Sequence, residues 1–181
     1  NGIVTVNGHS YEDPAKQTNN TNFALLVSEK FTEPFKEPIQ YGQHIARLAN
    51  MLGGGILVQR FGDLLDGRRS TPERIKSSVL TPTLTCATPG DLSLVIPYRQ
   101  MTSIIEMLYA LDKICPGTAS RYTLLYGIEV KFYSARVKLT NELETEGVKN
   151  LFTIGDGAGV TRGLIQASAS GVHVARTICA R

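Results

Sequence analysis

The stretch NLFTIGDGAGVTRGLIQASASGVHVAR, residues 150–176, determines the expected fold of the C-terminal part of the chain. The apolar run 151–154 predicts a buried strand, residues 155–159 a loop with few side chains, and residues 161–179 a helix. Small residues dominate one stripe of this helix, which would let it lie close to a sheet or a ligand. The stripe comprises Leu164, Ser168, Gly171, Val172, Ala175 and Ile178 or Cys179.

A strand, a glycine loop and a helix N-terminus in this order predict an anion site. The first N–H groups of a helix lack intrahelical partners, and the helix dipole favours negative charge there. Gly155, Gly157 and Gly159 allow close approach to the backbone. Asp156 has no obvious partner in the local sequence, and its charge is unfavourable beside a phosphate. We therefore expect it to accept hydrogen bonds from neutral hydroxyls, such as those of a sugar or ribityl chain.

Two common phosphate-binding motifs are excluded by the sequence of this loop. A GxGxxG motif beginning at Gly155 would need a third glycine where the chain has Val160. A GxxxxGK[ST] motif is absent, because no lysine follows these glycines.

The segment resembles the C-terminal Gly-Asp motif of flavoproteins with two dinucleotide-binding domains, in which a strand ends in Gly-Asp and a helix follows. The longer string GDGAGVTRGLIQASASGV, residues 155–172, is similar to a group of uncharacterised bacterial FAD-dependent dehydrogenases. Four more strings resemble the same group, in order along nearly the whole chain. They are NGHSYEDP (7–14), NTNFALLVS (20–28), RLANMLGGG (47–55) and QRFGDLLDGRRST (59–71).

The resemblance implies a role in FAD binding for residues 155–164. Asp156 would accept hydrogen bonds from the ribityl chain or its neighbourhood, and the three glycines would let the cofactor approach closely. The helix N-terminus would point toward the N1–C2 edge of the flavin and stabilise its reduced form. The residues expected there are Thr161, Arg162, Gly163 and Leu164.

Flavoproteins of this kind begin with a strand, GxGxxG and a helix, and nothing in this chain matches that motif. The resemblance therefore implies a C-terminal fragment of a longer enzyme, without FAD and inactive on its own. Residues 1–145 would form a middle, substrate-side α+β domain. Residues 146–181 would return to the Rossmann-like flavin domain as a strand, a glycine loop and a helix.

Two function classes stay open. The first is an FAD-dependent oxidoreductase that moves a hydride between a small-molecule substrate and the flavin. The second is a non-enzymatic binding module that uses residues 155–164 to hold a phosphate-bearing ligand.

Catalytic candidates are few. His9, with Tyr11 and Asp13, could handle a proton or face a substrate, or belong to a turn whose Asp and Ser bond their own backbone. Arg162 is expected in the first helical turn, where the dipole disfavours a cation. Arg162 either pairs with an anion, namely reduced flavin, a substrate carboxylate or a phosphate, or is an accident of the surface.

Charge and composition exclude other classes. The 181 residues are 42% hydrophobic and 19% charged, as in soluble globular proteins. The net charge of +3 is too small to indicate nucleic-acid binding. Arg60, Arg68 and Arg69 are interpreted as part of a solvated face. No apolar run approaches the roughly 18 residues of a membrane span, so we expect no transmembrane helix and no membrane contact.

The three cysteines match no metal-binding spacing. Cys86, Cys115 and Cys179 lie far apart, so we expect no metal site and buried thiols in a reducing cytoplasm, with a catalytic cysteine as the alternative.

The order of elements in residues 1–145 predicts an α+β domain with a mixed sheet. Helices are expected over residues 41–52, ended by a triple glycine, and over 101–115. Ser70-Thr71-Pro72-Glu73 predicts a third helix start, and residues 59–67 a loop with one short turn. Strands are expected at residues 1–8, 23–28, 56–58, 92–96 and 123–133, with 137–139 pairing to the last.

Overall fold

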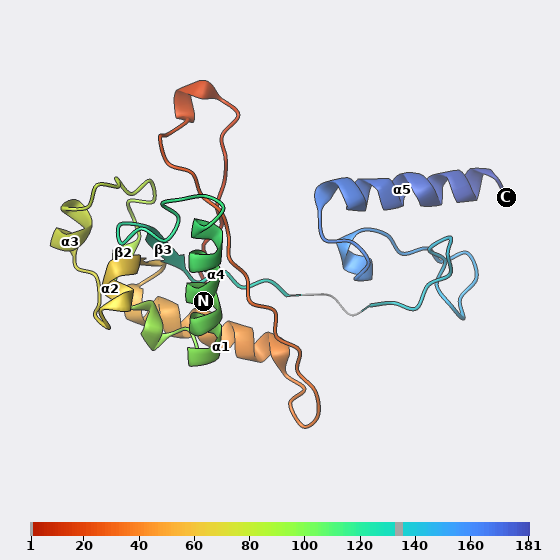
Figure 1. The fold of residues 1–181 in the computed structure, drawn as a ribbon. Helices are drawn as coiled ribbons and strands as arrows, with labels where there is room; N and C mark the ends of the chain where they lie inside the picture. Colours follow the sequence, from red (N-terminus) through yellow and green to blue (C-terminus); the bar gives the residue numbers. More distant parts are fainter. Residues whose placement is uncertain (1, 133–135) are drawn as a thin grey trace. The chain divides into compact units, whose positions relative to one another are not determined.

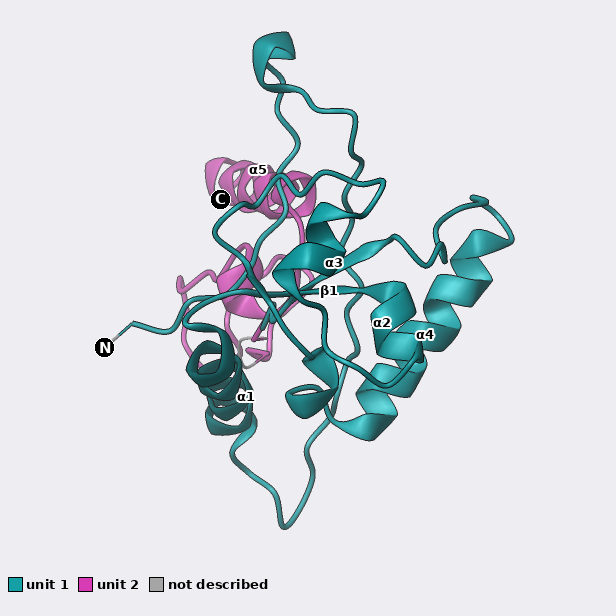
Figure 2. Cartoon of the chain, turned by 90° about the vertical axis from the view of Figure 1, so that its left-hand side faces the viewer, with its two compact units in different colours: residues 1–130 teal, residues 131–181 magenta. Residues whose placement is uncertain are grey.

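The computed structural model describes residues 2–132 and 136–181 of the chain. These residues form two compact units, the first unit Asn1–Val130 and the second unit Lys131–Arg181 (Figure 2). The described residues contain a three-stranded mixed sheet and five α-helices, which confirms the α+β class (Figure 1). The division at residue 145 and the membership of residues 146–181 in a Rossmann-like flavin domain stay predictions.

The sheet of the first unit is built around β1, Leu57–Arg60. Strand β2, Thr88–Pro89, pairs with β1 in parallel, and β3, Leu124–Gly127, pairs with it antiparallel. In the second pair Leu57 lies opposite Gly127. The predicted strand at 56–58 is confirmed, whereas the strand predicted for 123–133 is limited to β3 among the described residues. Tyr133 lies outside them.

Four helices accompany the sheet in the first unit: α1, Pro38–Gly53; α2, Phe61–Leu65; α3, Pro72–Lys76; and α4, Tyr98–Asp112. The sequence predicts three of these helices, α1, α3 and α4. Helix α2 occupies the region predicted as a loop with one short turn. Within the described residues, no helix combines the length and the apolar composition needed to cross a membrane.

Local capping explains where these helices begin and end. Gly54 adopts a left-handed conformation, with φ of 66°, and its N–H donates to the carbonyl of Asn50, which ends α1 as the triple glycine predicts. Thr71 caps α3, because its hydroxyl accepts from the Arg74 N–H at 3.3 Å.

The core of the first unit gathers around Phe61, which is fully buried and meets the Tyr109 ring edge-on with centroids 5.8 Å apart. Leu57 from β1 and Leu108 from α4 are buried beside it. Burial of such side chains contributes about 1.5–3 kcal/mol each. This core fixes the position of the segment 57–65, which carries the polar cluster described below.

Gly62 permits a close approach that alanine would block. A Cβ built on Gly62 would lie 2.9 Å from both the Cβ and the carbonyl oxygen of Arg121. We expect Gly62→Ala to lower the free energy of unfolding by about 1–2 kcal/mol, although alanine favours helix by up to about 1 kcal/mol. Chemical denaturation would measure the change. Gly55→Ala is the control, because a Cβ there meets nothing within 4 Å; equal losses in both variants would contradict the steric explanation.

Several predicted strands of the first unit are wrong. Residues 2–8 form no strand; Val6 donates one hydrogen bond to the Ile128 carbonyl at 2.9 Å, and the Asn50 side chain bonds both backbone groups of Val4 at 2.8 Å. The Asn50 side chain thus takes the place of a neighbouring strand in bonding the Val4 backbone. Residues 23–28 form no strand either, and Phe23 is 55% exposed.

The predicted strand at 92–96 and the predicted burial of the cysteines are also wrong. Residues Leu92–Leu94 form a 3-10 helix, since the Asp91 carboxylate accepts from the Ser93 N–H at 2.9 Å and caps a helical turn. Cys86, Cys115 and Cys179 are all exposed free thiols.

The second unit contains α5, Leu164–Cys179, and a 3-10 turn, η3, Asp156–Ala158. The buried strand predicted at 151–154 is wrong: Phe152 forms only an isolated bridge with Glu144, and Leu151 and Ile154 are 46% and 47% exposed. Leu139 bridges Thr145, so the pairing predicted for 137–139 with the strand at 123–133 is replaced by a local contact.

The buried face of α5 also differs from the predicted stripe. Ser170 and Val174 are its buried residues, whereas Leu164 is 88% exposed. Ser170 faces inward because its hydroxyl accepts from the Gly155 N–H at 3.0 Å and donates to the Ala167 carbonyl at 2.7 Å. As a result, the buried positions Ser170 and Val174 each lie one residue before the predicted positions Gly171 and Ala175.

The end of the chain is held by Arg181. Its guanidinium forms a hydrogen-bonded ion pair with Glu144 and lies over the Phe152 ring, 4.9 Å from its centroid. The Glu144 carboxylate also accepts from the Asn150 N–H at 2.6 Å. The hydrogen bond from Arg181, followed by that from Asn150, holds the pKa of Glu144 below its ordinary value of 4.5.

Acid is expected to weaken this end of the second unit. Because the folded-state pKa of Glu144 is lowered, the ion pair stabilises the unit above pH 4.5 and loses its effect as the pH falls through the folded pKa. Glu144→Gln should therefore reduce stability at neutral pH and flatten the loss on acidification, measured by thermal unfolding from pH 7 to pH 3. The exposed Glu146 provides the control; Glu146→Gln giving the same flattening would contradict the assignment.

Candidate functional site

The glycine loop of the second unit is held in a defined conformation. Gly155 and Gly159 adopt positive φ values of 70° and 69°, which disfavour other residues. Asp156 accepts a hydrogen bond from the Thr161 hydroxyl at 2.7 Å, so the expectation that it has no local partner is wrong. The structure thus brings together Asp156, the loop glycines and Thr161 in front of α5.

The helix begins later than the sequence predicts. Gly163 is the N-cap of α5 and Leu164 its first residue, so Thr161 and Arg162 precede the helix. The argument that Arg162 sits in an unfavourable first turn therefore no longer applies. Leu164 and the next residue, Ile165, are 88% and 83% exposed. The first turn of α5 thus presents apolar side chains beside its N–H groups.

The loop brings a carboxylate close in sequence to a helix N-terminus. Asp156 lies within the loop, and the N-cap of the sixteen-residue helix α5 follows at Gly163. A Cβ placed on Gly157 would meet nothing within 4 Å, so the loop backbone is sterically open there. Hydroxyl groups could donate to Asp156, and a partly negative group could approach the helix N-terminus.

His9 lies in the first unit, on an exposed loop. Its carbonyl accepts from the Asn22 side chain at 3.1 Å. Asp13 accepts from the Ala15 N–H at 3.0 Å and caps a 3-10 turn, as the turn interpretation of this segment predicts. The role of His9 as a proton-handling group stays a prediction.

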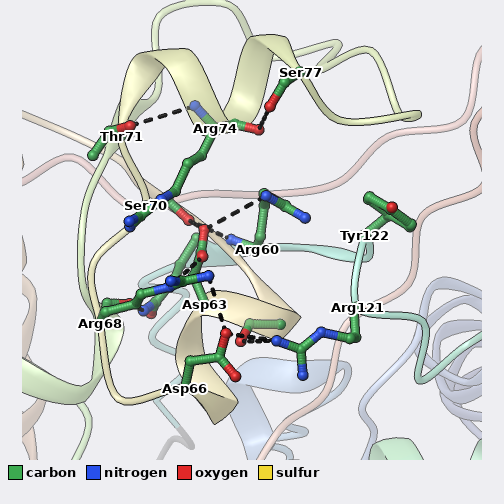
Figure 3. A network of polar contacts seen from close by, with 12 residues as sticks. Arg60, Asp63, Asp66, Arg68, Ser70, Thr71, Arg74, Ser77, Arg121 and Tyr122 are labelled. Atoms are coloured by element: carbon green, nitrogen blue, oxygen red, sulfur yellow. Dashed lines mark hydrogen bonds and ion pairs between the residues drawn. The ribbon is translucent and has the colours of Figure 1, made fainter.

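A second polar cluster lies in the first unit, and we call it the Asp63 network: Arg60, Asp63, Asp66, Arg68, Ser70 and Arg121 (Figure 3). Asp63 is 1% exposed, and both of its oxygens are used. One accepts from Arg68 Nε at 3.0 Å and the other from the Ser70 hydroxyl at 2.8 Å. Asp63 thus connects α2 to the segment that leads into α3.

The outer part of the network is centred on Asp66. One of its oxygens lies 3.0 Å from Arg68 Nη2 and 2.6 Å from Arg121 Nη2. The hydrogen bond from Arg121 is the main cause that holds the pKa of Asp66 below its ordinary value. The same hydrogen bond raises the pKa of Arg121. Arg121 therefore ties the segment before β3 to α2.

Arg60 and Gln59 place the network at the end of β1. Ser70, which is fully buried, accepts from the Arg60 backbone N–H at 2.8 Å. The buried Gln59 amide donates to the Arg68 carbonyl at 2.9 Å and accepts from the Leu92 N–H at 2.8 Å. The loop after α2 is thereby fixed by buried polar contacts.

The interpretation of these arginines as a solvated face is wrong for Arg60, whose side chain is only 17% exposed. It is confirmed for Arg68 and Arg69, which are exposed, although Arg68 also bonds the buried carboxylate of Asp63. The sequence signal was present in QRFGDLLDGRRST, where Asp63 follows Arg60 by three residues. That spacing alone does not distinguish a buried pair from an exposed one. Among the residues that the structure describes, no group of three or more His, Cys, Asp or Glu side chains could hold a metal ion.

Comparison with known proteins finds an uncharacterised relative. No family model matches the chain. A protein of Clostridium beijerinckii, named only as an uncharacterized protein, is 32% identical over 188 residues. The match includes 98% of this chain and 34% of the relative, so the chain spans about a third of that protein's length. The similarity extends over both units.

Proposed function

We propose that this chain supplies the substrate-side part and the C-terminal Gly-Asp loop of an FAD-dependent oxidoreductase. The proposal is supported by five sequence strings in the order found in that group of dehydrogenases. The structural observation that carries it is the pairing of Asp156 with Thr161 in an open glycine loop before α5. Bound FAD would supply hydride transfer to or from a small-molecule substrate.

The residues of this chain would bind and orient the cofactor. Asp156, fixed by Thr161, would accept a hydrogen bond from a cofactor hydroxyl. Gly155 and Gly159 give the loop its turns, and the N–H groups at the start of α5 would favour negative charge on a neighbouring group. The first unit would contact the substrate.

Absorbance spectroscopy on the purified gene product that carries this sequence tests the proposal. We expect an oxidised-flavin band, and release of FAD on denaturation. The 181-residue chain alone should not hold stoichiometric FAD, since it has no GxGxxG motif for the pyrophosphate. A gene product that stays colourless after incubation with FAD would contradict the proposal.

The alternative is a non-enzymatic module that binds a phosphate-bearing ligand at residues 155–164. It is favoured by the exposed first turn of α5 and by the missing GxGxxG motif. A gene product that binds nucleotides without the isoalloxazine ring as tightly as FAD would support this alternative.

The Arg162→Gln variant tests whether the Arg162 side chain or the N–H groups at the start of α5 supply the positive charge at residues 155–164. Arg162→Gln should leave the fold intact, because the residue is exposed and precedes the N-cap of α5. If Arg162 faces the flavin, the Arg162→Gln variant should have a more negative flavin reduction potential. If Arg162 faces an anionic substrate, the variant should bind that substrate more weakly. A redox titration and a substrate-binding curve measure the two. No change in either would leave the helix N-terminus as the electropositive element.

A further inference from the structure

We propose that Arg60, in the first unit, binds an oxyanion group, a carboxylate or a phosphate, of a small-molecule ligand. The proposal rests on the Asp63 network and on the Tyr122 ring beside Arg60, and it does not depend on flavin binding. It assigns a binding role to QRFGDLLDGRRST, residues 59–71, which the proposed function leaves without one.

The Arg60 guanidinium is mostly buried and has few hydrogen bonds. Its side chain is 17% exposed, and its Nε is buried without a hydrogen-bond partner among the described residues. A ligand could therefore reach only the Nη1 and Nη2 end of the guanidinium. Its nearest carboxylate oxygen, on Asp63, lies 4.0 Å from Nη1, which is an ion pair but too long for a hydrogen bond. A guanidinium has five N–H donors, so Arg60 is a weakly hydrogen-bonded, mostly buried cation.

Both carboxylate oxygens of Asp63 already accept hydrogen bonds from other residues. Arg68 Nε and the Ser70 hydroxyl take its two oxygens at 3.0 and 2.8 Å. Asp66 is likewise shared by Arg68 and Arg121. Three arginines therefore face two carboxylates within the network, so the network carries one net positive charge. Arg60 has the longest contact of the three.

Neighbouring residues hold Arg60 in place. Its guanidinium carbon lies 5.2 Å from the centroid of the Tyr122 ring, and its backbone N–H is fixed by Ser70. Figure 3 shows the side chain extending toward Tyr122, away from Asp66 and Arg68. An arginine fixed by stacking loses little conformational freedom when its planar fork binds a carboxylate or phosphate. The geometry thus suits an oxyanion that approaches beside the Tyr122 ring.

Anion binding to the 181-residue chain tests the proposal directly. The probes are inorganic phosphate and succinate, titrated at constant ionic strength and followed by thermal shift and by NMR. We expect both signals to saturate for the wild-type chain, and the stronger anion identifies the preferred group. Arg60→Gln should weaken binding by about ten- to one-hundred-fold, and Arg60→Lys by less, since it keeps the charge but loses the fork.

The matched control is Arg99→Gln, which removes the same charge from an exposed position on α4 and should leave binding unchanged. If circular dichroism shows that Arg60→Gln does not fold, Tyr122→Leu replaces it; Tyr122 is 40% exposed, and loss of its ring should also weaken binding. Wild-type chain that binds neither anion would overturn the proposal. So would equal weakening in the Arg99 variant, or unchanged binding in the folded Arg60 or Tyr122 variant.

Discussion

Replacing Asp63 by asparagine is expected to lower the free energy of unfolding of the first unit by about 2–4 kcal/mol. The side chain is 1% exposed and accepts from Arg68 and Ser70, with Arg60 4.0 Å away. Asparagine has nearly the same shape but no charge. It leaves the mostly buried Arg60 without a counter-ion, which is the costly consequence of breaking a buried pair. Urea denaturation followed by circular dichroism measures the change.

Asp66→Asn is the matched control for this prediction. Asp66 also bonds Arg68, through a contact of the same 3.0 Å length, but its side chain is 34% exposed against 1% for Asp63. Water replaces a lost carboxylate at an exposed site, so the loss should be much smaller. Similar losses in the two variants would contradict the claim that burial of Asp63 gives the network its importance.

The sequence predicts the elements whose signals are local. Helix α1 ends at a left-handed glycine, and α3 begins at a capping threonine. Both signals depend only on neighbouring residues. The spacing of apolar residues likewise predicts α4, and the run before Gln59 predicts β1. These predictions need no knowledge of what the elements pack against.

The wrong strand predictions depend on distant partners. The run at 23–28 is apolar enough for a strand, yet a strand also needs a paired neighbour, and Phe23 remains exposed. Residues 2–8 bond to Ile128 and Asn50, which no local pattern reveals. In the second unit, the Ser170 hydroxyl, rather than the apolar pattern, orients α5.

The same distinction applies to the candidate sites. Asp156 and the glycines are close in sequence, so their grouping is predictable, although the Thr161 bond and the later start of α5 are not. The Asp63 network joins α2, the loop before α3 and Arg121, which lies 55 residues after Asp66. The basic character of QRFGDLLDGRRST is visible in the sequence, but the burial of Asp63 depends on the core around Phe61.

In the gene product that binds FAD, Asp156→Ala should weaken FAD binding by about ten- to one-hundred-fold, the effect of losing a charge-assisted hydrogen bond. The fold should change little, because Asp156 is exposed and its loop is also held by the bond between Gly155 and Ser170. Fluorescence titration of the apoprotein with FAD measures affinity, and thermal unfolding of the apoprotein measures stability.

Thr161→Val separates a direct role of Asp156 in binding from a role in shaping the loop. Valine keeps the shape of threonine but cannot donate to the Asp156 carboxylate at 2.7 Å. If Asp156 binds the cofactor directly, the Thr161 variant should keep most of its affinity, since the carboxylate remains. If the carboxylate only orders the loop through Thr161, both variants should lose affinity equally. FAD binding unchanged in Asp156→Ala would show that this carboxylate does not contact the cofactor.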